Sequence, residues 1–102
     1  MDIAALTKRL HEIRDANNWR IFHSPKNLAM AASVEMSELV EIFQWHTEEQ
    51  SRALSEAERE HAGQEVADIL MYLTLLCSEL NIDMEQALAA KLADNERRFL
   101  HD

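Results

Sequence analysis

VADILMYLTLLC, residues 66–77, is the stretch that decides the fold of this chain. Only Asp68, Tyr72 and Thr74 interrupt its apolar side chains, so a helix built from it is hydrophobic almost all round. The rest of the chain supports a helical interpretation, because all 102 residues include only one glycine and one proline. Sheet proteins need many tight turns, so this composition predicts an all-α fold.

Four helices are predicted around this stretch, each from apolar residues spaced three and four apart and from capping residues at its ends. They cover approximately residues 3–17, 25–45, 58–80 and 84–99. Two capping boxes, Thr47-x-x-Gln50 and Ser55-x-x-Glu58, flank a glutamate-rich, solvated connection between the second and third helices. We expect a single domain, residues 1–102, in which four helices pack antiparallel.

The apolar third helix also bears on assembly. In a lone four-helix domain part of its surface would stay in contact with water, and burial against a second copy is the simplest remedy. We therefore expect a bundle that is completed by oligomerisation, as a homodimer or homotetramer.

Charge and composition exclude several classes of function. The chain has 10 Lys plus Arg against 19 Asp plus Glu, a net charge of −9, which disfavours binding to polymeric nucleic acid. With Gly63 as the sole glycine, a glycine-rich phosphate loop cannot form. The single cysteine, Cys77, fits a reducing compartment, and no segment has the length of a membrane span. These features predict a cytoplasmic protein that does not enter a membrane.

The second predicted helix carries two carboxylates away from its polar side. At about 100° per residue, Glu35 falls between Leu39 and Ile42 on the apolar side, and Glu38 lies at its flank. Residues three apart on a helix are neighbours, so this pair points toward the interior or its edge. A single glutamate is usually a surface residue, and only the repetition of the pattern favours a functional interpretation.

The third helix repeats the pattern with Glu65 and Asp68, again three apart and among apolar residues. If packing brings the pairs together, two carboxylates at ~5 Å repel by about 3 kcal/mol at an effective dielectric of 20. Protons or a cation must offset that repulsion, and four carboxylates without paired histidine or cysteine suit Mg²⁺ or Mn²⁺. A di-iron bundle would need two Glu-x-x-His motifs, and only Glu58-x-x-His61 is present.

Further candidate residues lie outside the acidic pairs. The connection before the second helix contains Trp19, His23, Lys26 and Asn27, and Trp45 ends that helix. Aromatic residues are usually core, but two tryptophans and an imidazole near a cation site also suit a stacking slot for a planar base. On the fourth helix, Lys91 and Asn95 can donate to an anionic ligand, although Asn95 could equally cap a neighbouring helix.

The combination of these segments resembles the MazG-like all-α nucleoside triphosphate pyrophosphatases, and among them the dCTP pyrophosphatase branch. The matching segments are FHSPKNL at 22–28, EMSEL at 35–39, FQW at 43–45 and EVADILMYL at 65–73, followed by Lys91 and Asn95. The resemblance implies a four-helix MazG-like bundle that hydrolyses a nucleoside triphosphate, with dCTP or a modified dCTP as the leading candidate, to the monophosphate and pyrophosphate.

The resemblance also implies roles for individual residues. The catalytic and Mg²⁺-binding carboxylates would be Glu35, Glu38, Glu65 and Asp68. The expected substrate-binding residues are Trp19, His23, Lys26, Asn27, Trp45, Tyr72, Lys91 and Asn95.

A non-catalytic helical interaction module with the same fold is the alternative. In it the acidic pairs are rim charges and the tryptophans anchor a partner. This alternative explains the position of Glu35 and Glu65 on apolar helix faces poorly.

Overall fold

The computed structural model describes residues 1–100, and every regular element in them is helical. The elements are α1 (Ile3–Ala16), the 3-10 helix η1 (Arg20–Phe22), α2 (Pro25–Phe43), α3 (Glu48–Ser51), α4 (Glu56–Glu79) and α5 (Met84–Phe99). The all-α prediction is confirmed, and so are the four long helices to within about two residues at each end.

Capping residues explain where the helices begin. The Asp2, Ser24 and Asp83 side chains each accept a hydrogen bond from the backbone N–H three residues later, at 2.9–3.1 Å. Both predicted capping boxes are present, and the one at Thr47 opens the single turn of α3 inside the connection expected to be irregular. Asn18 and Asn81 adopt positive φ just after α1 and α4, a conformation that asparagine tolerates.

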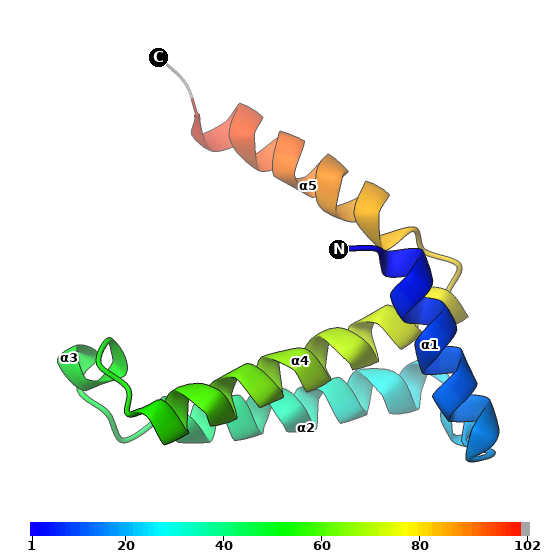
Figure 1. Ribbon diagram of the computed structural model, residues 1–102. Coiled ribbons are helices and arrows are strands. Elements are labelled where there is room, and N and C mark those ends of the chain that lie inside the picture. The colour runs from blue at the N-terminus through cyan, green and yellow to red at the C-terminus, as the bar shows by residue number, and fades with distance from the viewer. Residues whose placement is uncertain (101–102) are drawn as a thin grey trace.

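The centre of the molecule is the pair α2 and α4, which lie side by side and run antiparallel (Figure 1). The helix α1 crosses one end of this pair and packs on α4. The small core lies at that crossing, where Leu10, Leu28 and Leu75 are buried and Tyr72 packs against them. The fold therefore places the two helices that carry the acidic motifs side by side along a shared interface.

The helix α5 leaves the end of α4 and extends away from the pair, so the chain has the shape of an open V (Figure 1). The radius of gyration is 16.6 Å, whereas a compact chain of this length has about 13 Å. A single chain thus does not close the four helices into one bundle, since α5 finds no full face to pack against within it. The apolar side chains Leu70, Leu88, Leu92 and Phe99 remain 43–67% exposed.

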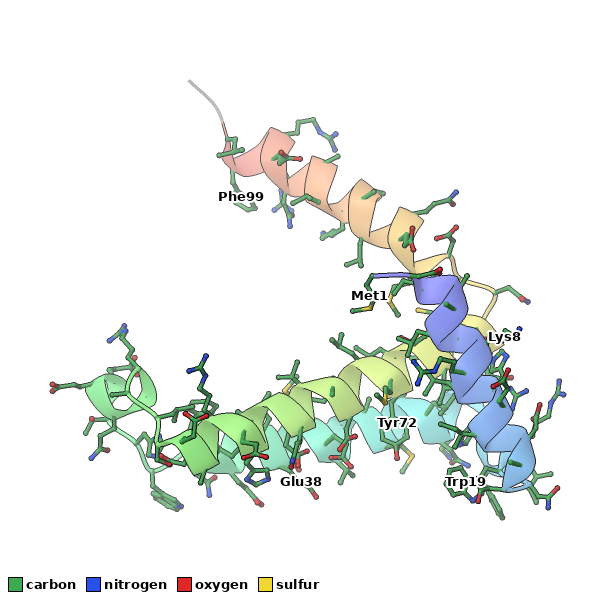
Figure 2. All side chains as sticks on the ribbon, in the orientation of Figure 1. Met1, Lys8, Trp19, Glu38, Tyr72 and Phe99 are labelled. Atoms are coloured by element: carbon green, nitrogen blue, oxygen red, sulfur yellow. The ribbon has the colours of Figure 1, made fainter. Side chains whose placement is uncertain are left out.

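An apolar hollow of about 710 Å³ lies among α1, α4 and α5, with Leu6, Leu70, Met84 and Leu88 among its lining residues. Figure 2 shows Phe99 at the far end of α5, well away from the α2–α4 pair. In residues 1–100, no helix combines the length and the apolarity that crossing a bilayer requires.

Candidate metal centre and adjoining pocket

Three of the four predicted carboxylates meet between α2 and α4. One oxygen from each of Glu35, Glu38 and Glu65 lies within 4.8 Å of the others. We call these residues the acidic cluster. Glu35 and Glu38 are one turn apart on α2, and Glu65 faces them from α4 with only 7% of its surface exposed. The antiparallel pairing of two helices that each carry acids three residues apart is what creates the cluster.

The neighbouring carboxylates change the pKa of Glu35. Hydrogen bonding with the Glu65 carboxylate raises the pKa of Glu35, and burial and the negative charges of Glu65 and Asp68 raise it further. Without a cation, Glu35 therefore retains its proton to higher pH than an ordinary glutamate.

Glu65 provides a test of whether a cation fits. Its Oε2 atom is buried and has no hydrogen-bond partner, although buried carboxylate oxygens normally have one. A divalent cation would satisfy that oxygen and offset the crowded charge. Because the donors are carboxylate oxygens, the residues present fit Mg²⁺ or Mn²⁺.

Asp68 is the predicted ligand that the structure does not bring into the cluster. It lies one turn after Glu65 on α4 and is exposed. Residues three apart differ by about 60° around a helix axis, and here that rotation moves Asp68 from the buried side of α4 to its open side. It still lies near the site, since its charge acts on Glu35 and both residues line the same pocket.

A pocket of about 400 Å³ adjoins the acidic cluster where α1 crosses α4; we call it the central pocket. It contains five of the predicted site residues, from α2, α4 and the connection before α2, and α1 completes its wall. Its lining consists of Leu10, Ile13, Arg14, Trp19, His23, Glu35, Asp68, Met71, Tyr72 and Leu75. Figure 2 places Trp19 and Tyr72 toward the α1 end of the α2–α4 pair and Glu38 farther along it.

The aromatic groups in the central pocket can receive a flat ligand. The Trp19 and His23 rings have centroids 6.4 Å apart and are tilted by 42°. The Nδ1 atom of His23 is buried without a hydrogen-bond partner, although buried polar atoms normally have one. A planar surface and an unsatisfied polar atom thus lie in the pocket that also contains Glu35 and Asp68.

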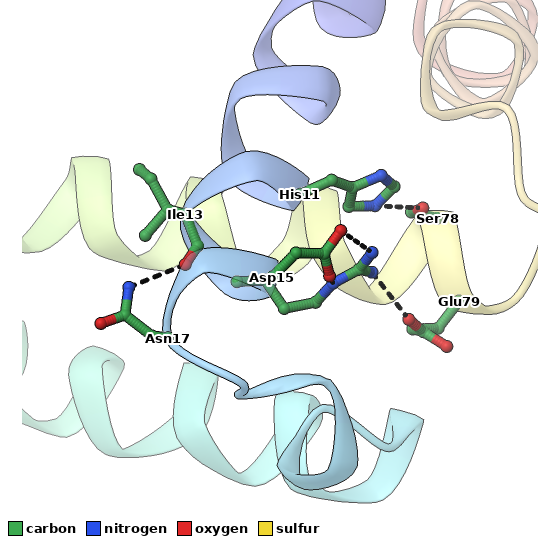
Figure 3. A network of polar contacts seen from close by, with 7 residues as sticks. His11, Ile13, Asp15, Asn17, Ser78 and Glu79 are labelled. Carbon is green, nitrogen blue, oxygen red and sulfur yellow. Dashed lines mark hydrogen bonds and ion pairs between the residues drawn. The ribbon is translucent and has the colours of Figure 1, made fainter.

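Arg14 is a pocket residue that was not predicted. It is 6% exposed, and its guanidinium contacts the carboxylates of Asp15 and Glu79, which Figure 3 labels. Its Nε donates to Asp15 Oδ1 at 2.9 Å, and its Nη1 atom lies 3.5 Å from Glu79 Oε1 at the end of α4. Hydrogen bonding to Asp15 raises the pKa of Arg14, and the same bond lowers the pKa of Asp15.

The same network fixes how α1 sits on α4. His11 and Ser78 are hydrogen-bonded at 2.9 Å beside the contact between Arg14 and Glu79 (Figure 3). The backbone oxygen of Arg14 accepts from the Trp19 N–H at 3.0 Å, so this arginine is joined directly to the pocket connection. A sequence signal existed, because Arg14 stands four residues after Leu10 and continues the apolar stripe of α1.

Within one chain the remaining predicted residues do not line the central pocket. The Asn27 side chain donates to the Phe22 oxygen at 3.0 Å and so stabilises the connection before α2. Lys26 is exposed at the start of α2. Trp45 is 87% exposed just beyond the other end of that helix, about 28 Å from Lys26 at 1.5 Å per residue. On α5, Lys91 lies 3.9 Å from Asp94, an acid that also pairs with two arginines of α5.

The sequence and the fold identify the family. The profile of the MazG-like family matches residues 30–100, which include the acidic cluster, most of α2 and all of α4 and α5. The chain therefore belongs to the MazG-like family.

Individual relatives agree with this assignment. The chain is 39% identical over 95 residues to dCTP pyrophosphatase 1 of Bos taurus and 36% identical over 95 residues to that of Homo sapiens. Each match covers 90% of this chain and 56% of the relative, so the chain spans about half the length of these mammalian proteins. The structure resembles a crystal structure of a pyrophosphatase from Archaeoglobus fulgidus, with a TM-score of 0.88, 36% identity and coverage of 96% of this chain and 92% of that one.

Proposed function

We propose that this protein is a Mg²⁺-dependent nucleoside triphosphate pyrophosphohydrolase. The observation that carries the proposal is the buried, unpartnered Oε2 of Glu65 in a cluster with Glu35 and Glu38, beside a pocket that holds an indole and an imidazole. The names of the mammalian relatives and of the archaeal pyrophosphatase point to the same chemistry.

The acidic cluster would hold the cation, and Asp68 would act from the pocket side. Mg²⁺ bound there would neutralise the triphosphate and polarise the phosphoryl oxygens. Water would attack the α-phosphorus, and the bond from that phosphorus to the bridging oxygen would break and release pyrophosphate. A carboxylate of Glu35, Glu38, Glu65 or Asp68 would accept the proton from the water.

For the substrate, we propose dCTP or a modified dCTP. Trp19 and Tyr72 offer flat surfaces for a base, and the free Nδ1 of His23 can recognise a polar edge of the base. Stacking tolerates any base, so selection falls to hydrogen bonding. The relatives named dCTP pyrophosphatase 1 favour the cytosine nucleotide.

We also propose that the working protein is a homodimer or homotetramer. The open V leaves Leu70, Leu88 and Leu92 exposed on facing helices, and a second copy would cover them. Trp45, Lys91 and Asn95 lie outside the central pocket of one chain, so in this proposal they reach a nucleotide bound to another copy.

Incubation of the protein with a panel of ribo- and deoxynucleoside triphosphates and Mg²⁺ tests the activity, with separation of all phosphate products. The proposal predicts a monophosphate and pyrophosphate, fastest from a cytosine deoxynucleotide. Release of orthophosphate as the primary product would contradict the reaction class. Absence of hydrolysis across the panel would favour the non-catalytic interaction module.

A further inference from the structure

One histidine contacts the acidic cluster from outside the set of residues assigned above. His61 lies one turn before Glu65 on α4, and its Nε2 atom is 3.3 Å from Glu65 Oε1. The two oxygens of Glu65 therefore differ: Oε1 lies 3.3 Å from the imidazole Nε2 of His61, whereas Oε2 is buried and has no partner. The unpartnered oxygen belongs to the residue that completes the acidic cluster from α4.

This asymmetry has a consequence for metal binding. The terminal torsion of a glutamate side chain is soft, so a carboxylate that is not held can turn away from a neighbouring site. Carboxylates that bind metals are usually held by a hydrogen bond from a neighbouring residue, and loss of that partner typically weakens metal binding by about 10- to 100-fold. His61 Nε2 is close enough to Oε1 to form such a hydrogen bond after a small rotation of either side chain, which would leave Oε2 available to a cation shared with Glu35 and Glu38.

The surroundings of His61 support this specific pairing. His61 also lines a shallow acidic pocket with Glu38, Glu41 and Glu58, so other carboxylates are near it. The ion-pair contact it makes is nevertheless with Glu65. A second histidine, His46, contacts Glu58 at 2.9 Å, but Glu58 is not part of the acidic cluster. In residues 1–100, the histidine–glutamate pair at the cluster is thus His61 with Glu65, and His46 with Glu58 is a control pair away from it.

We propose that His61 is a positioning residue, which fixes Glu65 through Oε1 so that Oε2 is presented to a divalent cation held with Glu35 and Glu38. The inference rests on the proposed function, because it assumes that the acidic cluster binds Mg²⁺. It assigns a role to a residue that neither the acidic motifs nor the central pocket contains.

Calorimetric titration of the full chain with Mg²⁺ tests the inference, using the wild type, His61→Ala, His61→Gln and His46→Ala at one pH. We expect His61→Ala to bind Mg²⁺ about 10- to 100-fold more weakly. The amide N–H of His61→Gln can still donate to Oε1, so this variant should recover most of the affinity. His46→Ala should bind as the wild type does, although it should lower the melting temperature more than His61→Ala, because His46 is more buried and packs edge-on against Phe43.

The wild type could bind Mg²⁺ and hydrolyse nucleotides while His61→Ala binds Mg²⁺ equally well. That result would overturn the role of His61 and leave the proposed function standing. His61→Gln as weak as His61→Ala would also overturn it, because the hydrogen bond would then not be the cause. A wild type that binds no Mg²⁺ would overturn the inference together with the metal dependence on which it rests.

Discussion

Glu35 on α2 and Glu65 on α4 approach each other across the helix pair, and the neighbouring carboxyl group of Glu65 is the largest cause of the raised pKa of Glu35. The contact joins the two sequence motifs that have matching spacing. It also leaves one oxygen of Glu65 buried and unpartnered. Two carboxyl groups in this arrangement are tolerated without a cation only while a proton remains on one of them.

This relationship predicts the pH dependence of stability in the metal-free protein. The pKa of Glu35 is raised above its ordinary value of 4.5 in the folded state. Its contribution to stability is therefore complete below the unfolded-state pKa and is lost as the pH rises through the raised folded-state pKa. Urea unfolding with a chelator, from pH 4.5 upward, should show a falling free energy of unfolding that Glu35→Gln largely removes. A curve for Glu35→Gln parallel to that of the wild type would contradict the assignment.

Divalent cation should stabilise the fold by mass action. A ligand at 100 times its dissociation constant adds about 2.7 kcal/mol to the free energy of unfolding. We expect Mg²⁺ to raise the melting temperature of the wild type at neutral pH, and Glu65→Gln to abolish the increase by removing the charge of the buried ligand. An equal increase in Glu65→Gln would place the cation elsewhere.

Nucleotide recognition should separate into affinity and selectivity. Base stacking contributes about 1–3 kcal/mol, so Trp19→Ala should raise KM by about 5- to 140-fold for every nucleotide, whereas Trp19→Phe should cost much less. His23→Ala should instead reduce the ratio of kcat/KM between dCTP and the other deoxynucleotides, by about tenfold for one hydrogen bond. Uniform loss of kcat/KM in His23→Ala would remove His23 from base recognition.

Arg14 should matter for the shape of the central pocket. Its side chain joins α1 to Glu79 on α4, and its backbone oxygen holds Trp19. We expect Arg14→Ala to destabilise the protein by roughly 1.5–3 kcal/mol, the range for hydrogen bonds to charged groups. It should also raise KM, because α1, which brings Leu10 and Ile13 to the central pocket, is then held less firmly on α4. Chemical denaturation and steady-state kinetics on the same preparation measure both effects, and an unchanged KM would separate Arg14 from the nucleotide.

Assembly should depend on the apolar face of α5. Leu92 is 61% exposed there, and Leu92→Glu would place a charge in the proposed contact between copies. Light scattering should show a dimer or tetramer for the wild type and a monomer for Leu92→Glu. Lys8→Glu, at an exposed position of α1, is a control for surface charge and should leave the assembly intact. A monomeric wild type at micromolar concentration would contradict the proposed oligomer.

Local features of the fold could be predicted from the sequence because they depend on neighbouring residues. The side chains of Ser24, Ser55 and Asp83 cap their own helices, so the sequence sufficed to place the starts of α2, α4 and α5. The acidic cluster was also predictable, since spacing of three on two apolar helix faces constrains where the carboxylates point.

Other features depend on packing angles, which local sequence does not determine. The direction of α5 depends on what covers its apolar face, which residue spacing does not reveal. The sequence therefore predicts antiparallel packing of four helices, whereas α5 extends away from the α2–α4 pair within one chain. The exposure of Asp68 follows from how α4 is rotated against α2, whereas Trp45 lies outside the central pocket because it stands beyond the far end of α2. The burial of Arg14 is hard to predict, because a cation on an apolar stripe usually extends its charged end to the surface.

The most direct test of the central claim is hydrolysis of dCTP with Mg²⁺ in water labelled with heavy oxygen, followed by mass spectrometry of the products. Attack at the α-phosphorus predicts label in the monophosphate and none in pyrophosphate, with turnover lost in Glu65→Gln. Label in pyrophosphate or orthophosphate, or equal turnover in Glu65→Gln, would contradict the account.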